Sequence, residues 1–149
     1  MVSWSEIEKA EPEFAAKVRG RFEAGRHKTI ATLRADGSPR ICGIETEFAD
    51  GELTFGSMPR ARKGADLLRD PRFALHSSTA DPPEDPKGWP GEAKVAGRAV
   101  VVKTPDGAEG DLFRADLDED VFTGLNAEAT LLVVEWWRPG VGLRRVERT

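Results

Sequence analysis

The fold is decided by residues 28–57, KTIATLRADGSPRICGIETEFADGELTFGS, where three β-rich runs alternate with two turn signals. Ala35-Asp36-Gly37-Ser38 is the first turn signal, and Asp50-Gly51 is the stronger one, because type I′ hairpin turns need positive φ angles. The links between the runs are too short for the crossover that parallel strands require. The stretch therefore predicts an antiparallel meander with strands over 28–33, 40–48 and 52–57.

Upstream of this meander, residues 1–26 have a helical pattern. Ser5-Glu6-Ile7-Glu8 matches a capping box and predicts a short helix, and Pro12 is expected either to begin a second helix or to kink the first. Gly25 is expected to end the helical segment. Apolar side chains at helical spacing predict one buried face, made of Ile7, Phe14, Val18 and Phe22.

Downstream of residue 57 the sequence predicts a helix over 61–69 and several more strands. Residues 112–125 predict a helical turn and then a short strand. Six or more antiparallel strands have edges to protect, and closure into a barrel protects them, so we expect a mainly β fold with flanking helices. The further strands are expected over 72–77, 92–103, 129–137 and 143–146, with a proline-rich loop over 78–91 and a turn at 105–107.

Length and composition fit one globular domain over residues 1–149, with a helical segment at 1–26 and a barrel over 27–149. No stretch has the roughly 20 apolar residues of a membrane span. A net charge of −4 argues against general binding to nucleic acid or to anionic membranes. The single cysteine excludes an intrachain disulfide, and the N-terminus lacks the apolar core of a signal peptide, so the sequence predicts a cytoplasmic protein.

A basic cluster, Arg60, Arg62 and Lys63, lies between the strand that ends at Gly56-Ser57 and the next helix. Cations are unfavourable at a helix N-terminus, whose free N–H groups attract anions, unless a bound anion offsets them. The cluster therefore predicts a phosphate site, and a solvated surface run neutralised by nearby acids is the alternative. Arg40 joins the site if the strand register brings it close, and is otherwise an edge arginine without a partner.

The remaining aromatic and metal-binding residue types give weaker signals. Trp136 and Trp137 are consecutive on a strand, so one faces inward and the other is expected to form a subunit interface or a ligand wall. Trp89, in the proline-rich loop, either covers a ligand as a lid or pins the loop to the barrel. The two histidines are not spaced as a metal pair and the single cysteine is expected to be a small core residue, so no metal site is predicted.

Three motifs, in this order, resemble the pyridoxamine 5′-phosphate oxidase-like family, the FMN-binding split barrels. Residues 30–40, IATLRADGSPR, resemble the family's opening hairpin. Gly56-Ser57, followed by ARKGADL at 61–67 and DPRFAL at 70–75, resembles its strand–helix–strand centre, and VAGRA at 95–99 resembles its next strand. The likeness covers about residues 14–103. It implies a split β-barrel that forms a homodimer with cofactor sites at the subunit interface.

The resemblance assigns roles to individual residues at the expected phosphate site. Arg62 and Lys63 match the pair that grips the cofactor phosphate, and Gly56 and Ser57 match the pair flanking the phosphate and the ribityl chain. Glu45 stands where the oxidase has a lysine, which removes one phosphate contact and adds repulsion.

The resemblance also places the ring system of the cofactor. Arg40 matches the arginine that begins the cofactor-binding strand, and the homodimer gives Trp137 and one of Arg144 or Arg145 a role in the neighbour's site. The ring system is expected to touch the backbone of the residues that follow Arg40, namely Ile41, Cys42, Gly43 and Ile44.

The resemblance implies a flavin- or deazaflavin-dependent oxidoreductase that transfers hydride between FMN or coenzyme F-420 and a small-molecule substrate. No side chain is assigned as a general acid or base, because hydride transfer is the cofactor's own chemistry. Pyridoxamine phosphate is not the expected substrate, because the oxidase's C-terminal signature is only loosely echoed. The main alternative is a carrier that binds a flavin or haem without turnover, and a further one is an apo homodimer whose basic cluster is only surface.

Overall fold

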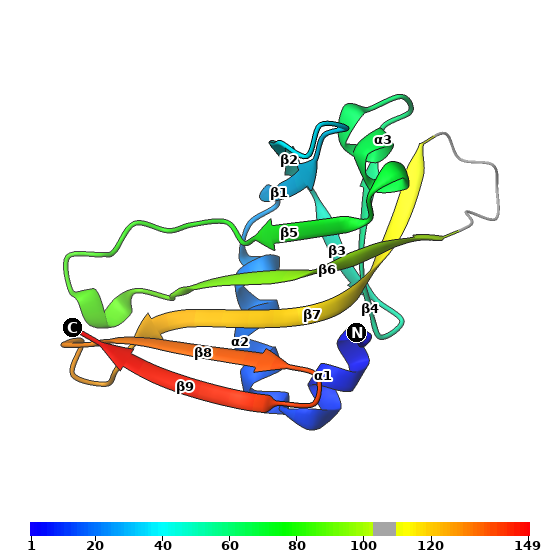
Figure 1. Cartoon of the computed structure of the whole chain (residues 1–149). Helices are drawn as coiled ribbons and strands as arrows, with labels where there is room; N and C mark the ends of the chain where they lie inside the picture. The colour runs from blue at the N-terminus through cyan, green and yellow to red at the C-terminus, as the bar shows by residue number, and fades with distance from the viewer. Residues whose placement is uncertain (103–109) are drawn as a thin grey trace.

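The computed structural model describes residues 1–102 and 110–149, and in this part of the chain the main element is a nine-stranded antiparallel sheet that curls on itself (Figure 1). The strands are β1 (Lys28–Leu33), β2 (Pro39–Ile44), β3 (Thr46–Ala49), β4 (Glu52–Ser57), β5 (Arg72–His76), β6 (Glu92–Val102), β7 (Asp111–Leu125), β8 (Leu132–Arg138) and β9 (Gly142–Arg148). Hydrogen-bonded neighbours follow the order β2-β1-β5-β6-β7-β4-β3, and β8 and β9 extend the sheet from β7. The predicted mainly β, antiparallel, barrel-like fold is confirmed.

The predicted strand over 40–48 is two strands in the structure. β2 pairs with β1, where Gly43 lies opposite Thr29, whereas β3 pairs with β4, where Thr46 lies opposite Phe55. β2 and β3 stand at opposite ends of the hydrogen-bonded strand order, and Glu45 is the residue that connects them. Residues 28–57 therefore curl the sheet instead of forming a flat meander, and β2 comes to lie near β4.

The prediction of a helical turn over 112–125 is wrong, because these residues belong to one continuous strand, β7. Its first half buries Phe113, Ala115 and Leu117 in strict alternation. A β-bulge opposite Ala96 and Gly97 then shifts the register by one residue, so that Asp120 faces inward. The shift interrupts the alternation of buried and exposed residues, so the sequence pattern does not indicate one continuous strand.

Two helices, α1 (Trp4–Ala10) and α2 (Pro12–Ala24), lie at the N-terminus, and α2 packs against β6 and β7. Pro12 begins the second helix, as one of the two predicted alternatives has it. The capping box is wrong, because α1 begins at Trp4 with Ser3 at its N-cap position and no side-chain cap. The predicted apolar face is confirmed, since the core contains Ile7, Phe14, Val18 and Phe22.

The proline-rich loop between β5 and β6 contains one turn of 3₁₀ helix, η1 (Pro86–Gly88). The indole Nε1 of Trp89 donates a hydrogen bond to the carbonyl oxygen of Ala80, at 3.0 Å, within the same loop. This contact lies within the loop, so the lid and the pinning of the loop to the barrel both stay predictions. The predicted turn at 105–107 and residue 103 of the predicted strand 92–103 lie outside the described residues. In the part of the chain that the structure describes, no helix is long and apolar enough to cross a membrane.

Candidate phosphate and cofactor site

The site begins where β4 ends and the third helix, α3 (Arg62–Arg69), starts. Ala61 at the N-cap position offers no capping side chain, and the first turn of α3 contains no acid. The first hydrogen bond of the helical pattern is donated by the N–H of Ala65, so the N–H groups just before it have no partner within the helix. Arg60, in the preceding turn, has a φ of 62°, a left-handed conformation that is uncommon for a residue other than glycine.

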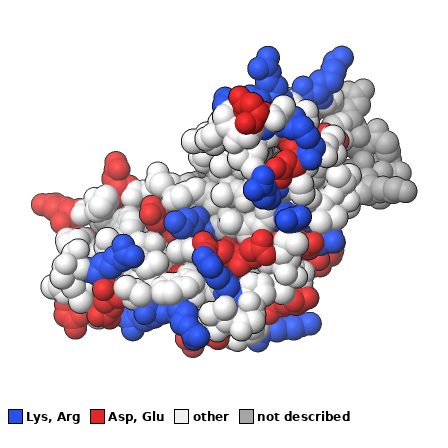
Figure 2. Space-filling model, viewed as in Figure 1, with Lys and Arg blue, Asp and Glu red and all other residues white. Residues whose placement is uncertain are grey.

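The cations at this helix end do not have acidic partners among the described residues. Every ion pair found in residues 1–102 and 110–149 involves other side chains than Arg62 and Lys63. Figure 2 shows Lys and Arg side chains projecting from the part of the molecule that contains α3 and β2 in Figure 1. Oδ2 of Asp111 nevertheless lies close to the first turn of α3, 2.9 Å from where a Cβ atom on Gly64 would be, so the phosphate site and the solvated surface run both stay predictions.

Ser57 lies directly against the first turn of α3. A Cβ atom on Gly64 would lie 2.4 Å from the Ser57 hydroxyl oxygen, so this close approach requires glycine. The same hydroxyl is buried and has no hydrogen-bond partner among the described residues. Buried hydroxyls are normally hydrogen-bonded, and this one lies beside the uncapped N–H groups. The local geometry thus places an unpaired hydroxyl against the first turn of α3.

A cavity of about 380 Å³ opens beside this helix end. The side-chain amine of Lys63 lies 3.3 Å from the carbonyl oxygen of Gly43 and donates a hydrogen bond to it, which ties α3 to β2. Three predicted site residues from three separate elements, Gly43, Gly56 and Lys63, therefore meet at one cavity. Its full lining is His27, Gly43, Ile44, Glu45, Gly56, Met58 and Lys63.

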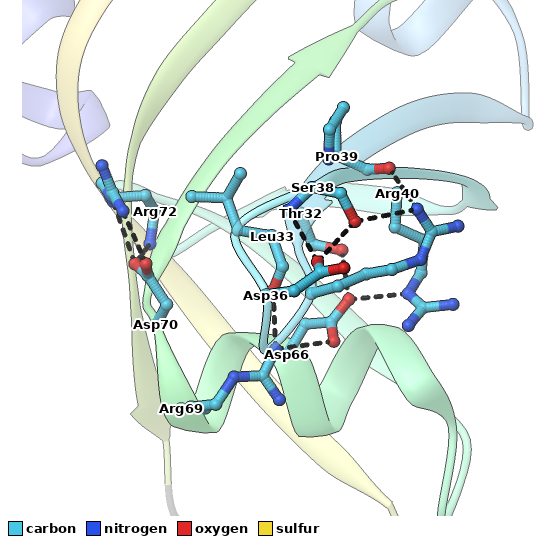
Figure 3. Close-up of polar contacts among 11 residues, drawn as sticks. Thr32, Leu33, Asp36, Ser38, Pro39, Arg40, Asp66, Arg69, Asp70 and Arg72 are labelled. Carbon is cyan, nitrogen blue, oxygen red and sulfur yellow. Dashed lines mark hydrogen bonds and ion pairs between the residues drawn. The ribbon is translucent and has the colours of Figure 1, made fainter.

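Arg40 does not stand among the unpaired cations, and it is not an unpartnered edge residue either. Its Nε donates a hydrogen bond of 2.7 Å to Oδ2 of Asp66 on α3 (Figure 3). Asp66 also accepts hydrogen bonds from the Thr32 hydroxyl at 2.8 Å and from Arg69 at 3.0 Å. Asp66 lies about one helical turn beyond Lys63. The charge of Arg40 is therefore balanced by a carboxylate before any ligand arrives.

Asp66, which joins this network to α3, was not among the predicted site residues. It is 2% exposed, and burial alone would raise its pKa, but hydrogen bonds from Arg40, Thr32 and Arg69 outweigh that effect and lower the pKa to about 2. Through these hydrogen bonds the ionised carboxylate links β1, β2 and α3. Its one sequence signal is an acid beside the buried Leu67, on the face of the helix that packs inward.

The remaining predicted site residues are placed around the cavity or away from it. Ile41, on the edge strand β2, is 73% exposed, while Cys42 on the other face of the strand is partly buried and packs against the core. Trp137 is 7% exposed and packs in the core of its own chain, and its expected role in a neighbouring subunit's site stays a prediction. Its neighbour Trp136 has the outward orientation on β8 and lines a shallow groove there.

The likeness to solved structures identifies the fold. No family model matches the chain, and no curated protein matches it. A pyridoxamine 5′-phosphate oxidase-related, FMN-binding protein from Nostoc punctiforme superposes with a TM-score of 0.64 at 10% identity, over 93% of this chain and 96% of that one. This chain has the split-barrel fold of pyridoxamine 5′-phosphate oxidase-like proteins.

Two further solved structures show the same split barrel. PhzG from Burkholderia lata, in complex with tetrahydrophenazine-1-carboxylic acid, has a TM-score of 0.61 at 14% identity, over 91% of this chain and 86% of that one. A heme-binding protein from Mycobacterium smegmatis has a TM-score of 0.60 at 15% identity and is matched over 90% of this chain. The chain spans 57% of the length of that protein. At such low identities the likeness establishes the fold of the split barrel.

Proposed function

We propose that this split barrel binds a phosphate-bearing redox cofactor, FMN or the deazaflavin coenzyme F-420, and acts as an oxidoreductase on a small molecule. The observation that carries the proposal is the combination at the start of α3. Arg62 and Lys63 have no acidic partner among the described residues, the helix end is uncapped, and the buried Ser57 hydroxyl is unpaired. Lys63 lines a cavity of about 380 Å³, and Gly56 and Met58, the neighbours of Ser57 in the chain, line it too.

The donor set fits a phosphate. Backbone N–H groups at a helix N-terminus, a hydroxyl and two cations all donate hydrogen bonds or positive charge, and a phosphate only accepts them. The phosphate role falls on Arg62 and Lys63, because Asp66 already balances the charge of Arg40. In this proposal Arg40 shapes the start of β2 and Ser57 completes the phosphate contacts.

The ring system would lie along β2, where Gly43 and Ile44 line the cavity. Gly43 leaves the backbone open to close approach. A bound flavin or deazaflavin supplies the hydride-transfer chemistry, and the chain supplies orientation and a site from which water is excluded. Met58, which lines the cavity, and Ile41, on the same strand as Gly43, are 79% and 73% exposed, and we propose that a second copy of the chain covers them and the cofactor.

A haem carrier is the second candidate, and one observation favours it. His27 lines the same cavity as Lys63, so an imidazole is available there as an axial ligand. One of the structurally similar proteins is described as heme-binding. In this version the basic residues at the start of α3 would bind the propionates instead of a phosphate.

Titration of the purified protein with FMN, coenzyme F-420 and haemin, followed by absorption, distinguishes these functions. We expect the FMN or F-420 complex to be bleached by a reductant and restored by an electron acceptor. Tight haemin binding that is lost in His27→Ala, with no binding of flavin or deazaflavin, would contradict the oxidoreductase and support the carrier.

A double variant tests whether Arg62 and Lys63 bind the phosphate. Arg62→Ala with Lys63→Ala should weaken binding of FMN or F-420 at least tenfold, or about 1.4 kcal/mol, because charge-assisted hydrogen bonds to the phosphate are lost. The matched control is Lys9→Ala with Lys87→Ala, which removes the same charge from two exposed sites. Equal affinity in the two double variants, with both folded by circular dichroism, would remove the phosphate site.

A further inference from the structure

A second cavity, of about 570 Å³, adjoins the cofactor cavity and has no part in holding the phosphate. The two cavities share Glu45 and Gly56 in their linings. The second one lies between the end of α2, the start of β1, and strands β3, β4 and β7. A molecule bound in the second cavity would lie beside the proposed cofactor. The residues that line this cavity therefore bear on which molecule would react with the cofactor.

The deep part of this cavity has hydrogen-bond donors without acceptors. Lys28, at the start of β1, is 6% exposed, and its amine donates one hydrogen bond, of 3.1 Å, to the carbonyl oxygen of Arg26. A lysine ammonium has three N–H donors, so this contact satisfies one of them. The Thr46 hydroxyl is also buried and has no partner among the described residues. Buried donors of this kind normally have acceptors.

Charged groups of the cavity act on the Lys28 amine from two elements. Burial lowers the pKa of Lys28, while the carboxylates of Glu45 and Glu23 act in the opposite direction. Glu23 belongs to α2 and Glu45 follows β2, and both line the cavity. The two acids that act on the Lys28 amine are therefore both part of the lining of this cavity.

The lining divides into an apolar, donor-bearing interior and an acidic rim. Phe55 is buried and Phe48 is partly buried, and both line the cavity with Lys28. The rim carries three exposed carboxylates against one exposed cation, Arg26, which pairs with Glu45 at 3.2 Å. An anionic ligand would meet like charge on entry, whereas a neutral ligand would not.

We propose that this cavity binds a small neutral molecule whose carbonyl oxygen accepts hydrogen bonds from Lys28 and Thr46, with an apolar body against Phe48 and Phe55. The carbonyl oxygen supplies the acceptor that the two donors lack. A ligand without charge avoids repulsion from the carboxylates of the rim. As the substrate class of the oxidoreductase, this assignment rests on the proposed cofactor site. As a binding site for neutral carbonyl compounds, it stands on the cavity alone.

Benzamide and benzoate test the proposal, because they share a shape and differ in charge. Titration of each into isotope-labelled protein, followed by backbone amide resonances in NMR, should give saturable shifts around Phe48 and Phe55, which line only this cavity, with benzamide and roughly tenfold weaker binding with benzoate. Lys28→Met should weaken benzamide binding by a similar factor. Lys94→Met is the matched control, since Lys94 is exposed on β6 and lies outside this cavity.

Thr46→Val is a second variant that keeps the ammonium group, and it should also weaken benzamide binding if Lys28→Met fails to fold. The proposal is overturned if benzoate binds as well as benzamide, if benzamide causes no saturable shift up to its solubility limit, or if folded Lys28 and Thr46 variants bind it normally. FMN and F-420 titrations of the same variants separate the two proposals. Benzamide binding without cofactor binding would contradict the oxidoreductase alone.

Discussion

At the scale of single residues, the packing of α3 against β1 and β2 depends on one buried carboxylate. Asp66 accepts hydrogen bonds from Thr32 on β1, from Arg40 on β2 and from Arg69 on its own helix. A buried ionised group is tolerated only when it is paired and hydrogen-bonded, and Asp66 is both. The network therefore fixes the angle at which α3 meets the two strands.

Replacing Asp66 tests this role through pH. Its folded pKa of about 2 lies below the ordinary 3.8, so its contribution to stability is present above pH 4 and is lost as the pH falls toward 2. Asp66→Asn should lower the free energy of unfolding by roughly 2–3 kcal/mol at pH 7. The difference from the wild type should shrink between pH 5 and pH 2 in urea unfolding.

Asp70 provides the matched control for that experiment. Hydrogen bonds from Arg72 lower the pKa of Asp70 to about 2 as well, but this pair lies at the surface. Asp70→Asn should therefore change stability much less, since exposed ion pairs contribute little. A loss in Asp66→Asn that stays the same from pH 7 to pH 2 would show that the carboxylate charge is not what stabilises the junction.

Asp120 behaves in the opposite way. Burial, with a smaller effect of Glu119, raises its pKa to about 8, and neither carboxyl oxygen has a partner among the described residues. A raised folded pKa means that stability falls as the pH rises from about 4 to about 8. Asp120→Asn should raise the melting temperature at pH 8 and much less at pH 5. Asp118→Asn, at an exposed position of the same strand, should show no such pH-dependent gain.

At the scale of elements, local signals predicted most of the strands and helices, and long-range effects caused the errors. Asp50-Gly51 correctly marks the β3–β4 hairpin, because a two-residue turn is decided by its own residues. The break at Glu45 is decided by which strands β2 and β3 find as partners, which no local pattern records. Gly97, a glycine inside a strand, is a sequence signal for the bulge opposite it, but the register that the bulge gives to β7 depends on strand pairing.

The same division holds for the candidate site. The position of Arg62 and Lys63 at a helix start could be predicted from the sequence, because strand, turn and helix follow one another there, and the resemblance added Gly56 and Ser57. The role of these residues at a phosphate stays a prediction. The pairing of Arg40 with Asp66 could not be predicted, since it joins residues 26 positions apart through the packing of α3 on the strands. The unpaired Ser57 hydroxyl and the core position of Trp137 likewise emerge only from three-dimensional packing.

The packing of α3 on β4 can be tested at one glycine. A Cβ atom at Gly64 would lie 2.4 Å from the Ser57 hydroxyl oxygen, so Gly64→Ala should push the helix off the strand, lower the melting temperature and weaken cofactor binding. Gly20→Ala in α2 is the matched control, because nothing lies within 4 Å of its added Cβ atom. The control should gain roughly 0.5–1 kcal/mol of helix stability. A stabilising Gly64→Ala would contradict the close approach.

At the scale of the whole molecule, curling of the sheet is what creates the site. It brings β2, from one end of the strand path, near β4, next to the other end, and α3 lies beside both. The exposed apolar side chain of Met58 lines the cavity, and that of Ile41 projects from β2, where the proposed second copy would complete the cavity. Fold, charge and exposed apolar surface therefore converge on one part of the split barrel.

The most direct measurement compares FMN with riboflavin, which has the same ring and ribityl chain but no phosphate. If Arg62, Lys63 and the start of α3 hold the phosphate, FMN should bind roughly ten- to hundredfold more tightly than riboflavin in fluorescence titrations. That difference should disappear in the Arg62→Ala, Lys63→Ala double variant. Equal affinities for the two flavins in the wild type, or a difference that survives the double substitution, would contradict the account.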